Sequence, residues 1–293
     1  MRNITEIIQQ NNRLSRSFLI RLESIYSQLN TVEKKAVYTI LTDNTLTEKI
    51  TITELSALAG CSNATLTRLA RKLGFKKFAD MKLEMFRSAP SDKNFYQNID
   101  ANDDTGTIID EFFQIAENSL EDTRALLTQE QVDEAVQILK GASKILFLGT
   151  GDAYSIAYAG YLKLYKAGFD VCCHMDYDAQ LIAASKLKEN DAVVAISHSG
   201  RTKQMNEILK IVKPRNVKII AIVSHPLSQI GKMADIVLLT PSFTHDIYNE
   251  LIAQRIPALA IIEILYILLI FNTGDEHIDC LKRTKLALKE NKL

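Results

Sequence analysis

The chain has 293 residues, a length typical of about two domains. Its composition, 47% hydrophobic and 24% charged, is that of a soluble globular protein, and its first ten residues lack the apolar core of a signal peptide. The formal net charge is zero, but residues 1–88 hold 14 Lys and Arg against 8 Asp and Glu, while residues 89–293 hold 21 against 27. This asymmetry indicates that the N-terminal part meets a polyanion and that the rest does not.

The four cysteines have neither metal-site nor disulfide spacing, which favours a reducing cytoplasm. Cys172 and Cys173 are adjacent, so on a strand they point to opposite faces and are not expected to share a metal ion. The most apolar run, residues 256–271, contains Pro257 and Glu263 and is short for a membrane span, which favours a buried or interface helix. We therefore expect no metal, no cofactor and no membrane attachment.

Apolar residues recur at helical spacing along residues 4–29 and again along residues 32–41. This pattern predicts one or two helices in the first stretch and another in the second, which Asn30 or Thr31 can cap. Basic residues add to the positive charge of the first stretch: Arg13, Arg16 and Arg21.

A short helix is predicted from residue 52, because Thr51 and Glu54 have the spacing of a capping box, and it stops at Gly60. Ser62 can cap the following helix, and two short helices joined by a tight turn with glycine are typical of a helix-turn-helix. Small and hydroxyl side chains near the start of the second helix, followed by long cations, suit the major groove of DNA. The alternative is a solvated basic helix of an ordinary bundle. The residues expected to contact DNA are Ser62, Asn63, Thr65, Thr67, Arg68, Arg71, Lys72 and Lys76.

The run ITELSALAGCSNATLTRLARKLGF, residues 52–75, resembles the N-terminal domain of RpiR-type bacterial transcriptional regulators. The sequence Arg-Lys-Leu-Gly-Phe followed by Phe78 is typical of that family. The resemblance covers residues 1–88 and implies an all-α helix-turn-helix domain that binds double-stranded DNA. Residues 89–107 are polar and without period, so they are interpreted as a linker.

Apolar runs alternate with helical patterns from residue 144 onward, after helices predicted at 108–127 and 131–139. Such alternation predicts a central five-stranded parallel sheet flanked by helices, within a second domain at residues 108–293. Ligands of these sheets bind at the carboxyl ends of the strands. The strands are expected at residues 144–148, 171–173, 192–196, 217–223 and 236–239.

The third predicted strand runs directly into Ser-His-Ser-Gly-Arg-Thr, residues 197–202, and then into a helix. This segment suits a phosphate group for three reasons: it has unpaired N–H groups at a helix start, a glycine that allows close approach, and three hydroxyl groups. The alternative is a plain helix cap. Gly149-Thr150-Gly151 follows the first strand, but Tyr154 occupies the third glycine position of a dinucleotide fingerprint, so a nicotinamide cofactor is not expected.

The two turns together resemble the sugar isomerase (SIS) domain, a phosphosugar-binding α/β fold, over residues 108–273. In that family the Ser-x-Ser-Gly-x-Thr turn holds the sugar phosphate. The first turn usually reads Gly-x-Gly-x-Ser, but here Ala153 stands at the serine position and Ser155 lies two residues on. The residues expected to bind the effector are Gly149, Gly151, Ser155, Ser197, Ser199, Gly200, Thr202 and Glu250.

Two main functions remain open. The first is a transcriptional regulator of carbohydrate metabolism genes, in which a homodimer or homotetramer of SIS domains senses a phosphorylated sugar and positions DNA-reading heads. The long helix expected at residues 247–272 suits either a two-fold interface or the core.

The second possible function is an aldose–ketose phosphate isomerase, for which His198, His245 and Glu250 are the available bases. His198 is expected to be a solvated loop residue. These residues form no convincing acid–base pair, so we expect a regulator without catalytic residues. A third reading, an oligomerisation domain that senses nothing, stays open because of Ala153.

Overall fold

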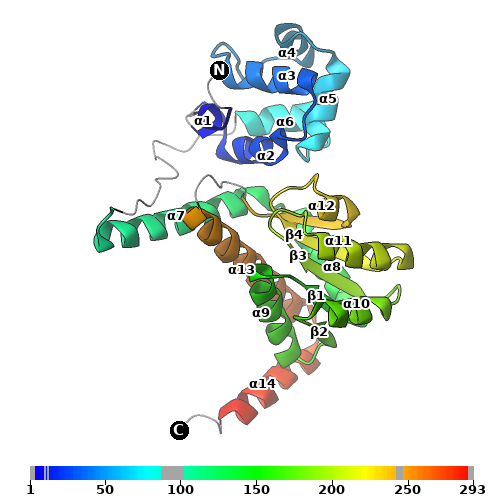
Figure 1. Ribbon diagram of the computed structural model, residues 1–293. Helices are drawn as coiled ribbons and strands as arrows, with labels where there is room; N and C mark the ends of the chain where they lie inside the picture. The colour runs from blue at the N-terminus through cyan, green and yellow to red at the C-terminus, as the bar shows by residue number, and fades with distance from the viewer. Residues whose placement is uncertain (1–3, 10, 12, 87–101, 242–246, 290–293) are drawn as a thin grey trace. The chain divides into compact units, whose positions relative to one another are not determined.

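The computed structural model describes residues 4–9, 11, 13–86, 102–241 and 247–289. The chain forms two compact units, Met1–Leu126 with Pro241–Asn249, and Leu127–Thr240 with Glu250–Leu293. The first unit has helices as its described secondary structure, and the second is built around a parallel sheet (Figure 1). The predicted fold class is confirmed.

The first unit has a helical core into which the helix-turn-helix is built. Its described helices are α1 (Ile4–Gln9), α2 (Arg16–Tyr26), α3 (Thr31–Thr42), α4 (Ile52–Ala59), α5 (Asn63–Lys72), α6 (Phe78–Met85) and α7 (Thr105–Leu126). The sequence pattern does not predict α6, because this short helix buries little more than Met81 and Met85 and so has no long apolar stripe.

Capping side chains fix the ends of these helices where the sequence predicts them. The Asn30 side chain accepts a hydrogen bond from the Glu33 N–H at 2.9 Å, and the Glu33 carboxylate accepts one from the Asn30 N–H at 3.0 Å. Thr51 and Glu54 form the same reciprocal pair at the start of α4. Gly60 ends α4 in the left-handed conformation, with φ of 60°, which glycine adopts without steric cost.

Three basic residues of the first stretch, Arg13, Arg16 and Arg21, donate hydrogen bonds to groups inside the unit. The Arg16 guanidinium donates two hydrogen bonds of 3.1 Å to the Asp122 carboxylate, and both side chains are buried. Arg21 donates to the Leu126 carbonyl oxygen at 2.9 Å, and burial lowers its pKa. Arg13 donates to a carbonyl oxygen of α3 at 2.6 Å. These cations hold helices together, α2 to α7 above all.

Helix α7 begins inside the predicted linker. The Asp104 carboxylate accepts a hydrogen bond from the Thr107 N–H at 2.9 Å and so caps a helix that starts at Thr105. Contacts assign all of α7 to the first unit, whereas the sequence-based boundary places residues 108–126 in the second domain. The part of the linker at residues 89–101 lies outside the described residues. The exact domain boundaries stay a prediction.

The second unit is a five-stranded parallel sheet in the order β2-β1-β3-β4-β5. Its strands are β1 (Ile145–Leu148), β2 (Val171–Cys173), β3 (Ala192–Ile196), β4 (Lys218–Val223) and β5 (Ile236–Leu239). Its helices are α8 (Gln129–Gly141), α9 (Asp152–Lys166), α10 (Tyr177–Ser185), α11 (Lys203–Val212), α12 (Gln229–Met233), α13 (Ile247–Asn272) and α14 (Asp275–Lys289), with a 3-10 turn at Lys213–Arg215.

Strand side chains point alternately to the two faces of the sheet, and helices bury both faces. On one face, alternate residues of β1, β3, β4 and β5 join α8, α9 and α13 in a single hydrophobic cluster. The other face is covered by α10 to α12, of which α10 contacts β1 and α12 contacts β4. This double cover explains why the strands read as unbroken apolar runs.

Helix α13 is apolar on two sides. One side is buried in the core and carries Ala258, Ile261, Ile262, Leu265 and Leu269. The other is exposed and carries Leu259, Ile264, Ile267 and Phe271. The segment Arg255–Asn272 is the one candidate membrane span among the described helices, by length and composition only, and 33% of it is buried in the unit. The buried side shows that α13 is a core helix of this unit, as one of the two sequence alternatives expects.

Candidate functional site

Helix α5 presents an exposed polar and cationic surface. Its first residues, Asn63 and Ala64, are exposed, and so are Arg68 and Arg71 further along. Leu66 and Leu69 on the opposite side are buried against the rest of the unit. Ser62 caps the helix by accepting a hydrogen bond from the backbone N–H three residues later. The exposed side of α5 therefore offers short side chains first and guanidinium groups next, as a helix in the major groove requires.

Two residues expected on this surface lie elsewhere. Thr65 is buried, and its hydroxyl lies 3.0 Å from the Ser62 hydroxyl, because residue 65 shares a helix face with Leu69, four positions on. The Lys72 ammonium is half-buried and lies 2.7 Å from the carboxylate of buried Glu33. Their expected outward orientation is wrong. We keep Ser62, Asn63, Thr67, Arg68, Arg71 and Lys76 as the candidate DNA residues.

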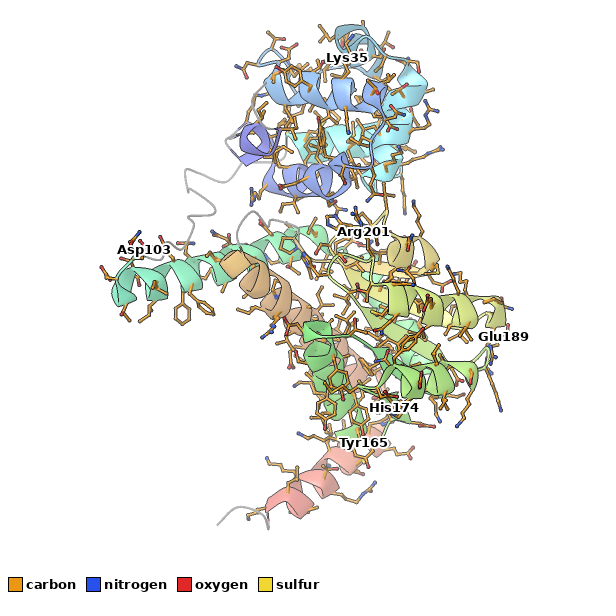
Figure 2. All side chains as sticks on the ribbon, viewed as in Figure 1. Lys35, Asp103, Tyr165, His174, Glu189 and Arg201 are labelled. Carbon is orange, nitrogen blue, oxygen red and sulfur yellow. The ribbon has the colours of Figure 1, made fainter. Side chains whose placement is uncertain are left out.

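The turn after β3 brings together the hydroxyl groups that the sequence singles out. The buried Ser197 hydroxyl lies 3.1 Å from the Thr202 hydroxyl, while Ser199 is exposed at the tip of the turn. The Gly200 N–H donates to the Ser197 carbonyl oxygen at 3.0 Å, which closes the turn. Helix α11 then begins directly after Thr202, so the free N–H groups of its first turn lie beside the hydroxyl groups of the 197–202 turn. Arg201 beside them is exposed (Figure 2).

Gly149 begins the second turn, at the carboxyl end of the neighbouring strand. β1 pairs with β3, with Leu148 opposite Ala195, so the Gly149–Gly151 turn and the 197–202 turn lie at the same edge of the sheet. From β1 the chain goes to β2 on one side of it, and then crosses over to β3 on the other side of β1. The gap between β1 and β3 is therefore the topological switch point, where ligands of open α/β sheets bind.

Ser155 does not replace the hydroxyl that is missing at Ala153. The two residues lie in the first turn of α9, and two helical positions are about 200° apart around the axis. Ser155 is exposed and donates its hydroxyl hydrogen to the Asp152 carbonyl oxygen at 2.7 Å. We therefore leave Ser155 out of the proposed site.

The expectation of a solvated His198 is wrong. The ring is partly buried, and its Nδ1 atom lies 2.6 Å from the Ser224 hydroxyl, which lies 2.9 Å from the Thr240 hydroxyl. Burial, with a smaller contribution from His225, lowers the pKa of His198 to about 3. The neutral ring links the phosphate-type turn to the carboxyl ends of β4 and β5, a contact between neighbouring strands that no local pattern reveals.

The remaining candidates lie at the start of α13. Glu250 belongs to this helix, but its side chain lies outside the described residues, as does all of His245. Further along α13, Arg255 forms an ion pair with Asp152 in the first turn of α9. Arg255 therefore lies near the Gly149–Gly151 turn, although the sequence analysis gives it no role.

Gln180 is a further residue that the sequence analysis misses. It lies in α10 and is completely buried. Its side-chain amide donates to the Gly149 carbonyl oxygen at 3.1 Å and to the His174 carbonyl oxygen at 2.7 Å. A glutamine in a helical pattern gives no local signal of this role, because both partners come from strand ends that the fold brings close.

A cavity of about 660 Å³ opens at the opposite edge of the sheet, where the strands begin. The Lys213 and Lys218 ammonium groups in its lining lie 3.5 Å and 3.8 Å from the same Asp235 carboxylate oxygen. These lysine charges are already paired, so this cavity suits an anion less well than the two turns at the carboxyl edge.

Comparison with known proteins decides the family. Residues 16–91 match the model of the helix-turn-helix domain of the rpiR family, and residues 138–268 match that of the SIS domain. The transcriptional regulator HexR of Escherichia coli is 30% identical over 279 residues, which cover 92% of this chain and 95% of HexR. The chain belongs to the rpiR family. Like other rpiR-family proteins of this architecture, it is a helix-turn-helix transcriptional regulator.

Further relatives have the same layout as this rpiR-family chain. An uncharacterised helix-turn-helix regulator of Thermotoga maritima is 28% identical over 278 residues, covering 93% of this chain and 98% of the relative. The structure of Vibrio vulnificus NanR complexed with ManNAc-6P has a TM-score of 0.60 at 21% identity, and covers 93% of this chain and 98% of NanR. The sugar isomerase domain of an RpiR transcription factor from Sphaerobacter thermophilus has a TM-score of 0.56 at 16% identity, with 61% and 98% covered. Likeness at these structural identities establishes the fold.

Proposed function

We propose that this regulator binds DNA through α5 and senses a phosphorylated sugar at the β1/β3 edge of its SIS domain, and thereby controls carbohydrate metabolism genes. The observation that carries the proposal is the pair of turns at residues 149–151 and 197–202, which lie at the same edge of the sheet, beside the switch point between β1 and β3. The second turn offers three hydroxyl groups and a helix N-terminus to an anion. NanR, complexed with ManNAc-6P, has this fold.

An Arg68→Ala variant is expected to lose DNA affinity by about 1–3 kcal/mol, because the exposed guanidinium of α5 contacts a base or a phosphate. Fluorescence anisotropy with the operator fragment measures this loss. Lys186→Ala is the matched control, since it removes one exposed cation at the C-cap of α10 and should leave DNA affinity unchanged. Equal affinities of the Arg68 variant and the wild type would contradict the assignment of α5 as the reading helix.

A Ser199→Ala variant is expected to bind DNA normally and to bind its sugar phosphate about ten-fold or more weakly, because a hydrogen bond to a charged group is lost. Ser199 is exposed, so the fold tolerates the change. Titration calorimetry with glucose 6-phosphate, fructose 6-phosphate and N-acetylmannosamine 6-phosphate measures binding, and anisotropy measures the response of the DNA complex. Ser155→Ala is the control and should respond like the wild type. An unchanged response in Ser199→Ala would remove the 197–202 turn from the site.

We propose that the SIS domain has no isomerase activity. Isomerisation needs a base with a pKa near the working pH, and the pKa of His198 is lowered to about 3 while its ring bonds Ser224. Turnover of the same three sugar phosphates tests this directly. Clear interconversion of aldose and ketose that a Glu250→Gln variant abolishes would favour the enzymatic alternative.

We also propose that the protein is a cytoplasmic homodimer or homotetramer. The exposed apolar side of α13, which carries Ile264, Ile267 and Phe271, suits a second copy of the chain, since contiguous exposed apolar surface usually marks an interface. The other side of α13 belongs to the core of the sheet, which favours this role over a membrane span. Light scattering of the wild type and of Ile267→Asp tests the assembly.

A further inference from the structure

Gln180 links the two strand ends on the far side of the phosphate-type turn. Its Nε2 atom donates to the carbonyl oxygens of Gly149, after β1, and of His174, after β2 (Figure 2 labels His174). Both partners are acceptors, so the amide can have only one orientation: the NH2 group faces them, and the amide oxygen lies on the other side. Two neighbouring loops therefore hold this side chain in one position.

The amide oxygen of Gln180 is buried and has no hydrogen-bond partner among the described residues. A buried acceptor without a donor costs free energy, so such atoms nearly always have a partner from the protein, from water or from a ligand. The described residues supply both contacts of the NH2 group but none of the oxygen. A donor from outside the described residues is therefore expected at this atom.

Helix α10 holds Gln180 firmly in place. The Asp176 carboxylate caps the helix by accepting from the Ala179 N–H at 2.9 Å, and the Tyr177 hydroxyl donates to the Glu207 carboxylate of α11 at 2.7 Å. The side chain therefore sits on a rigid helix tied to the one that follows the 197–202 turn. Rigid placement of this kind is what a residue that discriminates between ligands needs.

The place of Gln180 matches the sugar end of the proposed effector. β1 lies between β2 and β3, and strand neighbours are about 5 Å apart, so Gly149 lies about one spacing from the 197–202 turn. With the phosphate at that turn, the rest of the molecule extends toward Gly149 and the Gln180 amide. Sugar hydroxyl groups and acetamido N–H groups are the donors that an amide oxygen accepts.

We propose that Gln180 determines specificity for the sugar part of the effector. Its NH2 group holds the Gly149–Gly151 turn in place, and its oxygen accepts a hydrogen bond from a hydroxyl or N–H group of the sugar. The proposal rests on the sensing function proposed above, and it assigns the discrimination between sugars to a buried glutamine rather than to the phosphate turn. Inorganic phosphate, which lacks the sugar, does not use this contact.

Calorimetry on the full chain compares inorganic phosphate with glucose 6-phosphate, fructose 6-phosphate and N-acetylmannosamine 6-phosphate, in wild type and in Gln180→Met. Methionine has a similar shape but neither donor nor acceptor strength. We expect the affinity for inorganic phosphate to stay unchanged and the affinity for the preferred sugar phosphate to fall about ten-fold or more. Gln137→Met, an exposed glutamine on α8 at the opposite edge of the sheet, is the control and should change neither.

Deoxy analogues of the preferred sugar phosphate provide a second test that includes the wild type. The analogue that lacks the group donating to the Gln180 oxygen should bind the wild type more weakly than the complete sugar phosphate does. The Gln180→Met variant should bind this analogue and the complete sugar phosphate equally well. An equal loss for phosphate and sugar phosphate with a lower melting temperature would reduce Gln180 to a structural residue. Unchanged affinities would mean that water satisfies the oxygen. Either result overturns the proposal, whereas a wild type that binds none of the three sugar phosphates overturns the sensing function itself and this proposal with it.

Discussion

A Gly200→Ala variant is expected to lose effector binding while its first unit keeps its affinity for DNA. Gly200 has φ of +63°, a conformation that costs an L residue about 1–2 kcal/mol. An added Cβ atom would also lie 2.0 Å from the Ser228 Oγ atom and 2.6 Å from the Ser228 Cβ atom. The backbone cannot move aside, because the Gly200 N–H donates to Ser197 and its carbonyl oxygen accepts from Ile230 at 3.1 Å. The turn must distort, and its hydroxyl groups move with it.

Titration calorimetry with the three sugar phosphates measures this loss, and a thermal melt shows whether the second unit remains folded. A Gly200→Ala, Ser228→Gly double variant removes the clashing atoms and leaves the backbone strain, so it should recover part of the binding. Glycine still serves acceptably as the cap of α12 at position 228. Gly141→Ala, which adds a Cβ atom with no neighbour within 4 Å, is the matched control. Full binding in the single variant would show that the turn does not hold the ligand.

An Asp122→Ala variant is expected to destabilise the first unit by about 3–5 kcal/mol, because it removes the buried carboxylate that accepts two hydrogen bonds from the buried Arg16 guanidinium. Stabilities of single domains are about 5–15 kcal/mol, so this is a large fraction of the total. Thermal unfolding of the full chain, followed with hydrogen exchange of α2 and α7, measures the effect. Loss of protection should be confined to the helices of the first unit.

Glu121→Ala is the matched control for that variant, since it removes the adjacent but exposed carboxylate of α7 and should cost little. An Arg16→Met, Asp122→Leu double variant removes both charges and should recover much of the stability, because apolar pairs replace buried ion pairs well. Similar melting temperatures for Asp122→Ala and Glu121→Ala would mean that the ion pair contributes nothing in solution.

Local signals in the sequence account for most of the fold. The capping pairs at Asn30 and Thr51 specify helix starts because their partners lie three residues away. The strands can be predicted from the sequence because burial on both faces of the sheet makes them continuous apolar runs. Helix α10 starts at Tyr177 because Asp176 caps it, again through a partner three residues away. Helix α14 has no fully buried residue, and the sequence analysis gives no signal for it.

The candidate site is predictable only in part, because its supporting contacts join distant residues. The hydroxyl-rich turn is contiguous and is therefore visible in the sequence. His198 with Ser224, Gln180 with Gly149, and Arg16 with Asp122 are separated by 26, 31 and 106 residues. Each of these polar contacts depends on which strands or helices become neighbours. A single chain cannot specify that choice through spacing alone.

The internal arginines of the first unit affect how the regulator responds to ionic strength. Residues 1–88 contain fourteen lysines and arginines, but Arg13, Arg16 and Arg21 donate hydrogen bonds to groups inside the protein. Counter-ions are released from DNA only by cations that reach its backbone, at about 0.9 ion for each phosphate neutralised. Complex formation is therefore less steeply dependent on salt than the number of basic residues indicates, and the few exposed cations at α5 and just beyond it dominate the slope.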